Sequence, residues 1–163
     1  MNLPASVYES SDGGLMEADF QTVAHEVLAF LRGRIGFDLW MVTRTEGDDW
    51  IVLAAEDHGY NVVSGDLFRW SDSFCSRMVE GLGPRFAPDS TSVPAYVEAP
   101  IGQQVPIGAY IGVPIGRGDE MFGTLCAINP SAMPDAIRDE QPLVELGPQP
   151  EEAYDARQVV RAI

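Results

Sequence analysis

Hydrophobic residues recur every three or four positions between residues 16 and 35, and mostly polar residues fill the positions between them. This spacing predicts an amphipathic helix over 16–35, with one apolar side facing a core. Arg32 and Arg34 fall in its last turn, where positive charge is favoured, and Gly36 follows as a stop signal. The polar, Gly- and Ser-containing residues 1–15 are expected to form a flexible arm.

Short runs of strand-forming residues come in two pairs farther along the chain. Residues 37–43 and 50–55 flank the turn-rich Glu46-Gly47-Asp48-Asp49, and residues 107–113 and 121–128 flank a second, Gly-rich turn. Such runs around such turns predict two antiparallel hairpins.

The segment between the hairpins is expected to wind across the domain. A short strand is expected near 67–70, and Ser71 and Asp72 resemble the start of a short helix. Six prolines lie between residues 84 and 114. They exclude a long helix there, because proline lacks an N–H and clashes with the preceding turn.

The chain beyond the second hairpin predicts one more helix over 135–146, which Gly147-Pro148-Gln149-Pro150 ends. Residues 147–163 are expected to form a tail broken by Pro and Gly, with a short helix. The order of helix, hairpin, short helix, crossover, hairpin and helix predicts an α+β domain over 16–146. We expect its helices to be grouped on one face of an antiparallel sheet.

The charge of the chain is one-sided. Its 25 acidic residues outnumber ten basic ones, all arginine, and the net charge is −15. This acidity argues against binding a nucleic-acid backbone or an anionic membrane surface. No apolar run is long enough to span a membrane, and the N-terminus lacks the features of a secretory signal. We therefore expect a cytoplasmic protein whose partners include neither nucleic acid nor membrane.

Few side chains suggest catalysis or metal binding. CxxC, HExxH and Cys/His clusters are absent from the sequence, so no metal site is expected. The carboxylate pairs Asp48-Asp49 and Asp119-Glu120 fall in predicted turns and are expected to be solvated rather than catalytic. His58 has two interpretations, a haem ligand and a solvated loop residue, of which the second is favoured.

Four segments resemble GAF domains, in particular a subgroup common in actinobacterial signalling proteins. WSDSFCSRMV (70–79) is similar to their short helix, and FAPD (86–89) to a short Pro-Asp element. IGAYIGVPI (107–115) and FGTLCA (122–127) closely resemble their central hairpin.

The resemblance implies an antiparallel sheet of five or six strands. The N- and C-terminal helices would pack on one face, and a short helix with loops would cover a pocket on the other. It also implies a non-enzymatic sensory module that binds a small ligand or dimerises beside a signalling output domain or protein. The helix over 16–35 would be the homodimer surface. In the family the last helix usually continues, whereas Gly147-Pro148 interrupts it here.

The resemblance places a candidate ligand pocket between the sheet and its cover. The expected pocket residues are Trp70, Phe74, Cys75, Asp89, Tyr96, Tyr110 and Thr124. An alternative is that the aromatic residues fill this space and leave no pocket. The sequence does not identify a cofactor, and an anionic ligand would need help from Arg69, Arg77 or Arg85.

The two cysteines, Cys75 and Cys126, suggest an alternative function. With them the protein would be a thiol-based redox sensor, or an enzyme similar to GAF-type free methionine sulfoxide reductases. Bilin-binding relatives attach their chromophore through a cysteine that is commonly followed by His, whereas Ser76 follows Cys75 here. The favoured interpretation is that both cysteines are buried core residues.

Overall fold

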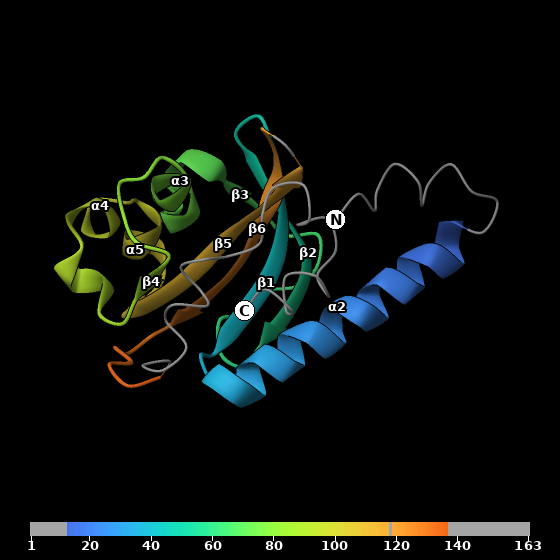
Figure 1. Cartoon of the computed structure of the whole chain (residues 1–163), viewed down its shortest axis with the longest axis horizontal. Coiled ribbons are helices and arrows are strands. Elements are labelled where there is room, and N and C mark those ends of the chain that lie inside the picture. The colour runs from blue at the N-terminus through green and yellow to red at the C-terminus, as the bar shows by residue number, and fades with distance from the viewer. Residues whose placement is uncertain (1–12, 118, 137–163) are drawn as a thin grey trace.

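A six-stranded antiparallel sheet forms the centre of the computed structural model, which describes residues 13–117 and 119–136 (Figure 1). The strand order is β3-β2-β1-β6-β5-β4. In chain order the strands are β1 (Leu39–Glu46), β2 (Asp49–Asp57), β3 (Leu67–Arg69), β4 (Phe86–Ala87), β5 (Ala109–Arg117) and β6 (Glu120–Asn129).

Both expected hairpins are present, as β1–β2 and β5–β6. They join through the pairing of β1 with β6, in which Thr43 lies opposite Thr124. The α+β class with an antiparallel sheet is therefore confirmed. Residues 137–146 of the expected helix over 135–146, the tail 147–163 and residues 1–12 of the expected arm lie outside the described residues.

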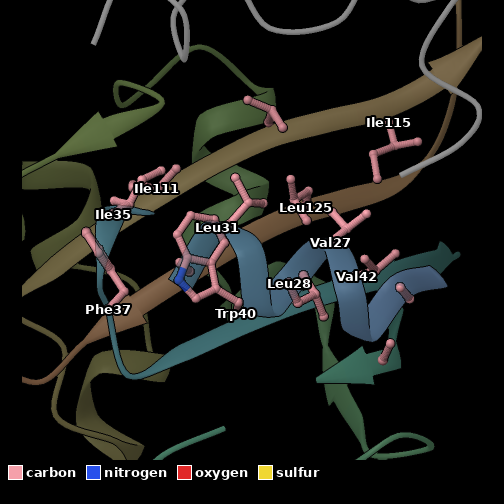
Figure 2. Close-up of a cluster of buried hydrophobic side chains, with 14 of the residues drawn as sticks. Val27, Leu28, Leu31, Ile35, Phe37, Trp40, Val42, Ile111, Ile115 and Leu125 are labelled. Atoms are coloured by element: carbon pink, nitrogen blue, oxygen red, sulfur yellow. The ribbon is translucent and has the colours of Figure 1, made fainter. Parts of the chain in front are cut away.

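Helix α2 (Gly13–Ile35) packs across one face of the sheet, against β1 and β2 (Figure 1). It begins at Gly13, inside the segment expected to be an arm. Its buried residues keep the helical spacing read from the sequence and pack against side chains from the sheet, in a cluster that includes Val27, Leu28, Leu31, Ile35, Trp40, Val42 and Leu125 (Figure 2).

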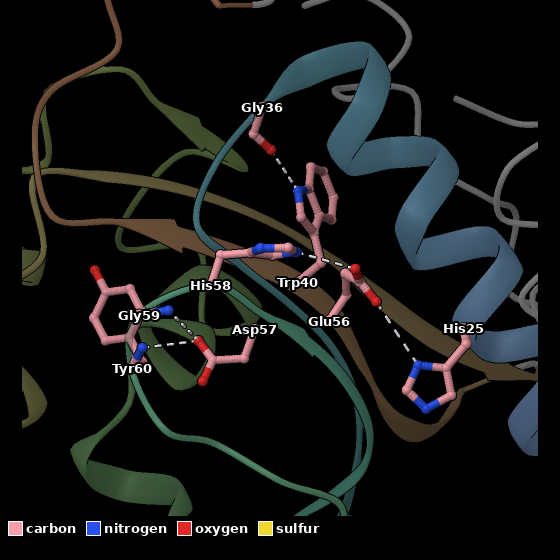
Figure 3. Close-up of polar contacts among 8 residues, drawn as sticks. All are labelled: His25, Gly36, Trp40, Glu56, Asp57, His58, Gly59 and Tyr60. Atoms are coloured by element: carbon pink, nitrogen blue, oxygen red, sulfur yellow. Dashed lines mark hydrogen bonds and ion pairs between the residues drawn. The ribbon is translucent and has the colours of Figure 1, made fainter.

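The end of α2 is fixed by two hydrogen bonds at Gly36. Its φ of +95° is in the left-handed region that favours glycine, and its N–H donates to the Arg32 carbonyl at 2.8 Å. Its own carbonyl accepts from Trp40 Nε1 at 2.6 Å (Figure 3). These contacts turn the chain directly from α2 into β1.

Short helices cover the opposite face of the sheet: η1 (Trp70–Asp72), α3 (Phe74–Val79), η2 (Ser90–Ser92), α4 (Pro94–Val97) and α5 (Ile101–Gln104) (Figure 1). The expectation that helices are grouped on a single face is therefore wrong, whereas the covering elements that the family resemblance implied are present. Residues 39–43 of β1 are all buried because both faces of the strand are covered.

The start of the short helix also differs from the expectation. Ser71 and Asp72 belong to η1, and α3 begins after Ser73. Ser73 is the N-cap, because its Oγ accepts the N–H of Ser76 at 3.0 Å. The shift places Phe74 and Cys75 in the first turn of α3, facing the sheet.

Candidate functional site

A small cavity of about 50 Å³ lies between the sheet and the covering helices. One side of the cavity is lined by strands β1, β2, β3, β5 and β6. The other side is lined by helices α3 and α5, the loop that follows β2, and the segment that precedes β5. No lining side chain is ordinarily charged. The lining residues are Leu39, Met41, Trp50, Tyr60, Val62, Phe68, Phe74, Cys75, Ile101, Val105, Ile107, Tyr110, Cys126 and Ile128.

Three aromatic rings fill the space beside this cavity. Phe74 stacks on Tyr96, with ring centroids 4.7 Å apart and planes 9° apart. Both rings meet Tyr110 edge-on, at 5.7 Å and 5.1 Å. Such geometries stabilise a packed core beyond the area that they bury. This cluster holds α3 and α4 against β5.

A chain of hydrogen bonds crosses the buried sheet and ends at the sulfur of Cys75. Trp50 Nε1 donates to Thr43 Oγ1 at 2.9 Å, and Thr43 Oγ1 lies 2.7 Å from Thr124 Oγ1. Thr124 Oγ1 donates to Cys75 Sγ at 3.5 Å, and the Tyr110 hydroxyl donates to the same sulfur at 3.3 Å. Cys75 Sγ is thus the acceptor for two hydroxyl groups.

The environment distinguishes the two thiols. Burial raises the pKa of Cys75, but hydrogen bonds from Cys126, Thr124 and Tyr110 favour its thiolate and bring the pKa below its ordinary value. The hydrogen bond to Cys75, burial and the nearby sulfur raise the pKa of Cys126. If one of the two buried thiols ionises, it is therefore Cys75.

Gly112 leaves open the space that the Tyr110 side chain occupies. Tyr110 and Gly112 point to the same face of β5, and a Cβ at residue 112 would overlap the Tyr110 hydroxyl. Without a side chain at 112, the ring lies along the strand and its hydroxyl reaches Cys75. Glycine is required here for space.

The structure separates the seven expected pocket residues into three groups. Phe74, Cys75 and Tyr110 line the cavity. Tyr96 and Thr124 support it from behind, by stacking on Phe74 and by hydrogen bonding to Cys75.

Trp70 and Asp89 lie away from the cavity. Trp70 precedes α3 in η1 and packs edge-on against Trp50, with 6.3 Å between ring centroids. Asp89 is exposed, and its carboxylate accepts the N–H of Thr91 at 3.0 Å as the N-cap of η2. The helix start at Ser73 and this capping role explain why neither side chain reaches the cavity.

Sequence reasoning missed Thr43, Trp50 and Met41. The sequence feature that could have indicated this site is Thr43, a polar residue within the apolar run of β1, which faces Thr124 across the β1–β6 pair. A buried hydroxyl needs a partner, so such a pair marks a polar path through the core.

The loop after β2 brings Tyr60 and Val62 to the cavity. The Asp57 carboxylate accepts the backbone N–H groups of Gly59 at 3.1 Å and Tyr60 at 2.8 Å (Figure 3), and that of Val62 at 2.9 Å. Burial raises the pKa of Asp57, but these bonds outweigh it and lower the pKa. The Tyr60 hydroxyl donates to the Pro106 carbonyl at 2.7 Å, which ties this loop to the segment before β5.

The two histidines lie on either side of one carboxylate at the edge of the sheet. His58 Nε2 is 3.1 Å and His25 Nδ1 is 3.9 Å from oxygens of Glu56 (Figure 3). His58 is absent from the cavity lining. Within residues 13–117 and 119–136, no cluster of three or more His, Cys, Asp or Glu side chains could hold a metal ion.

The model of the GAF domain family matches residues 19–146, which is most of the sequence. The chain therefore belongs to the GAF domain family. No protein of curated function matches the sequence. Among the described residues, no helix has the length and apolar character that crossing a membrane requires.

Solved structures with the same fold include domains of bacterial phytochromes and of PixJ. The blue-light-absorbing form of the PixJ GAF domain from Thermosynechococcus elongatus is 18% identical, with a TM-score of 0.61, covering 90% of this chain and 87% of that one. The chromophore-binding domain of an unusual bacteriophytochrome from R. palustris is 20% identical, with a TM-score of 0.58. The match covers 78% of this chain and 52% of that one. The chromophore-binding domain of Stigmatella aurantiaca phytochrome P1 is 16% identical, with a TM-score of 0.58. The match covers 86% of this chain and 57% of that one. The chain thus spans little more than half of these phytochrome fragments.

Proposed function

We propose that this chain is a cytoplasmic, non-enzymatic sensory module that binds a small, uncharged and mainly apolar ligand between the sheet and its covering helices. The observation that carries the proposal is the cavity itself. Its wall is formed almost wholly by apolar atoms, and the thiols of Cys75 and Cys126 are the weakly polar groups among the lining side chains. Small-molecule sites have this composition, apolar walls with few polar groups that orient the ligand.

The charge of the site narrows the class of ligand. Arg69 lies 3.7 Å from Asp48, and Arg77 donates to the carbonyls of Ser71 and Ser73. Neither arginine is among the lining residues, so the cavity offers no charge to an anionic ligand such as a cyclic nucleotide. The same argument disfavours free methionine sulfoxide as a substrate, because an amino acid carries two charges that the lining does not balance.

The size of the cavity further restricts the class of ligand that it can hold. Sites for drug-sized molecules occupy roughly 300–1,000 Å³, far more than the 50 Å³ found here. The similar structures include chromophore-binding domains, but a tetrapyrrole would require the segment over 57–106 to move outward. We therefore favour a ligand no larger than a small aromatic molecule such as indole.

The response to a ligand would involve the short covering elements and the helix on the other face. A ligand that displaces α3 or α5 changes the packing on β1 and β6, and α2 packs on the far side of β1. Phe30 on α2 is 52% exposed, so this helix presents an apolar residue to a second copy. Dimerisation through α2 would carry the signal to an output domain or protein.

Native mass spectrometry of protein purified from its own cells tests the proposal, together with an absorption spectrum. We expect an added mass of a small organic molecule, lost on denaturation, and no visible absorption band. A bound bilin or haem would contradict the proposed ligand class. Ligand-free protein that also fails to bind indole or benzene in vitro would contradict ligand binding itself.

A further inference from the structure

Two cysteines that are 51 positions apart in the sequence meet at the cavity. Cys75 comes from α3 and Cys126 from β6, both are reduced and buried, and both line the cavity. Each thiol alters the pKa of the other, which Cys126 lowers at Cys75 and Cys75 raises at Cys126. The pair therefore connects the covering helix to the centre of the sheet at the wall of the cavity.

The polar groups around the pair single out one sulfur. The hydroxyls of Tyr110 and Thr124 both donate to Cys75 Sγ, at 3.3 Å and 3.5 Å. A neutral thiol is a weak acceptor, so two hydroxyl donors are better matched to a thiolate. The thiolate is the reactive form of cysteine, whereas a cysteine buried among apolar groups alone is inert.

We infer that Cys75 and Cys126 form a reversible redox pair, in which a hydroperoxide oxidises Cys75 and Cys126 then closes a disulfide between α3 and β6. In the first step the Cys75 thiolate attacks the terminal oxygen of the hydroperoxide. The S–O bond forms, the O–O bond breaks, and the alkoxide or hydroxide leaves and takes up a proton, leaving a sulfenic acid.

In the second step the sulfur of Cys126 attacks the sulfur of Cys75. The S–S bond forms, the S–O bond breaks, and the hydroxyl leaves as water with the Cys126 proton. Two thiols are thus oxidised by two electrons and one hydroperoxide is reduced. A dithiol reductant reverses the reaction by thiol–disulfide exchange.

The cavity has room for this chemistry. Its volume of about 50 Å³ exceeds the roughly 10–15 Å³ that one water molecule needs, so hydrogen peroxide fits beside the sulfurs. The disulfide would fix the covering helix to the sheet across the ligand cavity. This inference goes beyond the proposed function, because no ligand takes part in the reaction.

The experiment measures disulfide formation in the full chain by intact mass. Reduced protein is treated with increasing hydrogen peroxide, then denatured and alkylated with a maleimide. We expect a monomer that has lost two hydrogen atoms and no longer takes up maleimide, and that regains both alkylation sites after dithiothreitol. Two alkylatable thiols at peroxide concentrations that fully oxidise glutathione would overturn the inference, as would a disulfide found only between chains.

Variants assign the order of the two steps. Cys126→Ser should stop at a sulfenic acid on Cys75, which dimedone traps, whereas Cys75→Ser should trap none. Equal trapping in both variants would contradict the assignment.

A matched pair of hydroxyl deletions tests the role of the donors. Tyr110→Phe removes a donor to the sulfur and should slow oxidation several-fold. Tyr96→Phe removes a hydroxyl that donates to the Pro84 carbonyl instead, and should slow oxidation less than Tyr110→Phe does. Equal rates in the two variants would contradict activation by Tyr110. Because ligand binding is measured separately, failure of the redox pair leaves the proposed function standing.

Discussion

The Tyr110 hydroxyl lies 3.3 Å from Cys75 Sγ, and Gly112 makes this contact sterically possible. Tyr110 belongs to β5 and Cys75 to α3, so the hydrogen bond joins the sheet to its covering helix.

Gly112→Ala should destabilise the protein by about 1–3 kcal/mol, the usual range for adding a methyl group to a packed core. The new Cβ would overlap the Tyr110 hydroxyl, and Met78 Cε at 3.3 Å limits relaxation. Urea denaturation measures the loss. Combining Gly112→Ala with the shorter side chain of Tyr110→Leu should cost less than the sum of the two single substitutions, and strict additivity would contradict the steric cause.

Thr43→Val should reduce stability by about 1–3 kcal/mol, because the isosteric change leaves Trp50 Nε1 buried without its acceptor. Thr45→Val is the matched control on the same strand. Thr45 Oγ1 is buried and has no hydrogen-bond partner among the described residues, so its removal should be neutral or stabilising. Equal losses in the two variants, measured by chemical denaturation, would show that the chain of hydrogen bonds contributes nothing.

Leu28→Ala should cost about 2–5 kcal/mol, because Leu28 is fully buried between α2 and the sheet. Phe30→Ala on the same helix removes a larger side chain that is 52% exposed, and should change stability by less than about 0.5 kcal/mol. Thermal and urea denaturation of both variants provide the comparison. A larger loss for Phe30→Ala would show that its surface is covered in solution, for example by a second copy.

Asp57→Asn should destabilise the protein at neutral pH, and the loss should vanish in acid. The pKa of Asp57 is lower in the folded protein than the ordinary pKa of an aspartate side chain. Its carboxylate therefore contributes stability above the unfolded pKa, and this contribution disappears as the pH falls through the folded pKa. Melting temperatures of both proteins between pH 7 and about pH 2.5 test this. A difference that stays constant over the whole range would contradict a contribution from the ionised carboxylate.

Sequence periodicity predicted the elements with strong patterns. The apolar spacing that ends at Ile35 and the two Gly-containing turns define α2 and both hairpins, because burial on one side leaves a regular repeat. The start of α3 was less predictable, since three neighbouring residues, Ser71, Asp72 and Ser73, all suit an N-cap. The hydrogen bond to Ser76 decides in favour of Ser73.

The candidate site was predictable only in part. Phe74, Cys75 and Tyr110 were found through the family resemblance, but the meeting of Cys75 with Cys126 depends on how α3 lies on β6. Trp70 and Asp89 were placed in the pocket because they belong to the same segments, and local chain geometry turns both away. Thr43 became part of the site through the pairing of β1 with β6, which are far apart in the sequence, and Trp50 reaches Thr43 across the β1–β2 hairpin.

The most direct test of the central claim is an NMR titration of the uniformly labelled protein with indole, read at the residues that line the cavity. We expect shifts confined to residues around the cavity, such as Val62, Ile101 and Ile128, and a melting temperature that rises with indole concentration. Val62→Phe, which fills the cavity, should abolish both effects. Val97→Phe places the same side chain on the exposed surface of α4 and should preserve them. Shifts scattered over the surface, or equal binding by wild type and Val62→Phe, would contradict a ligand site between the sheet and its covering helices.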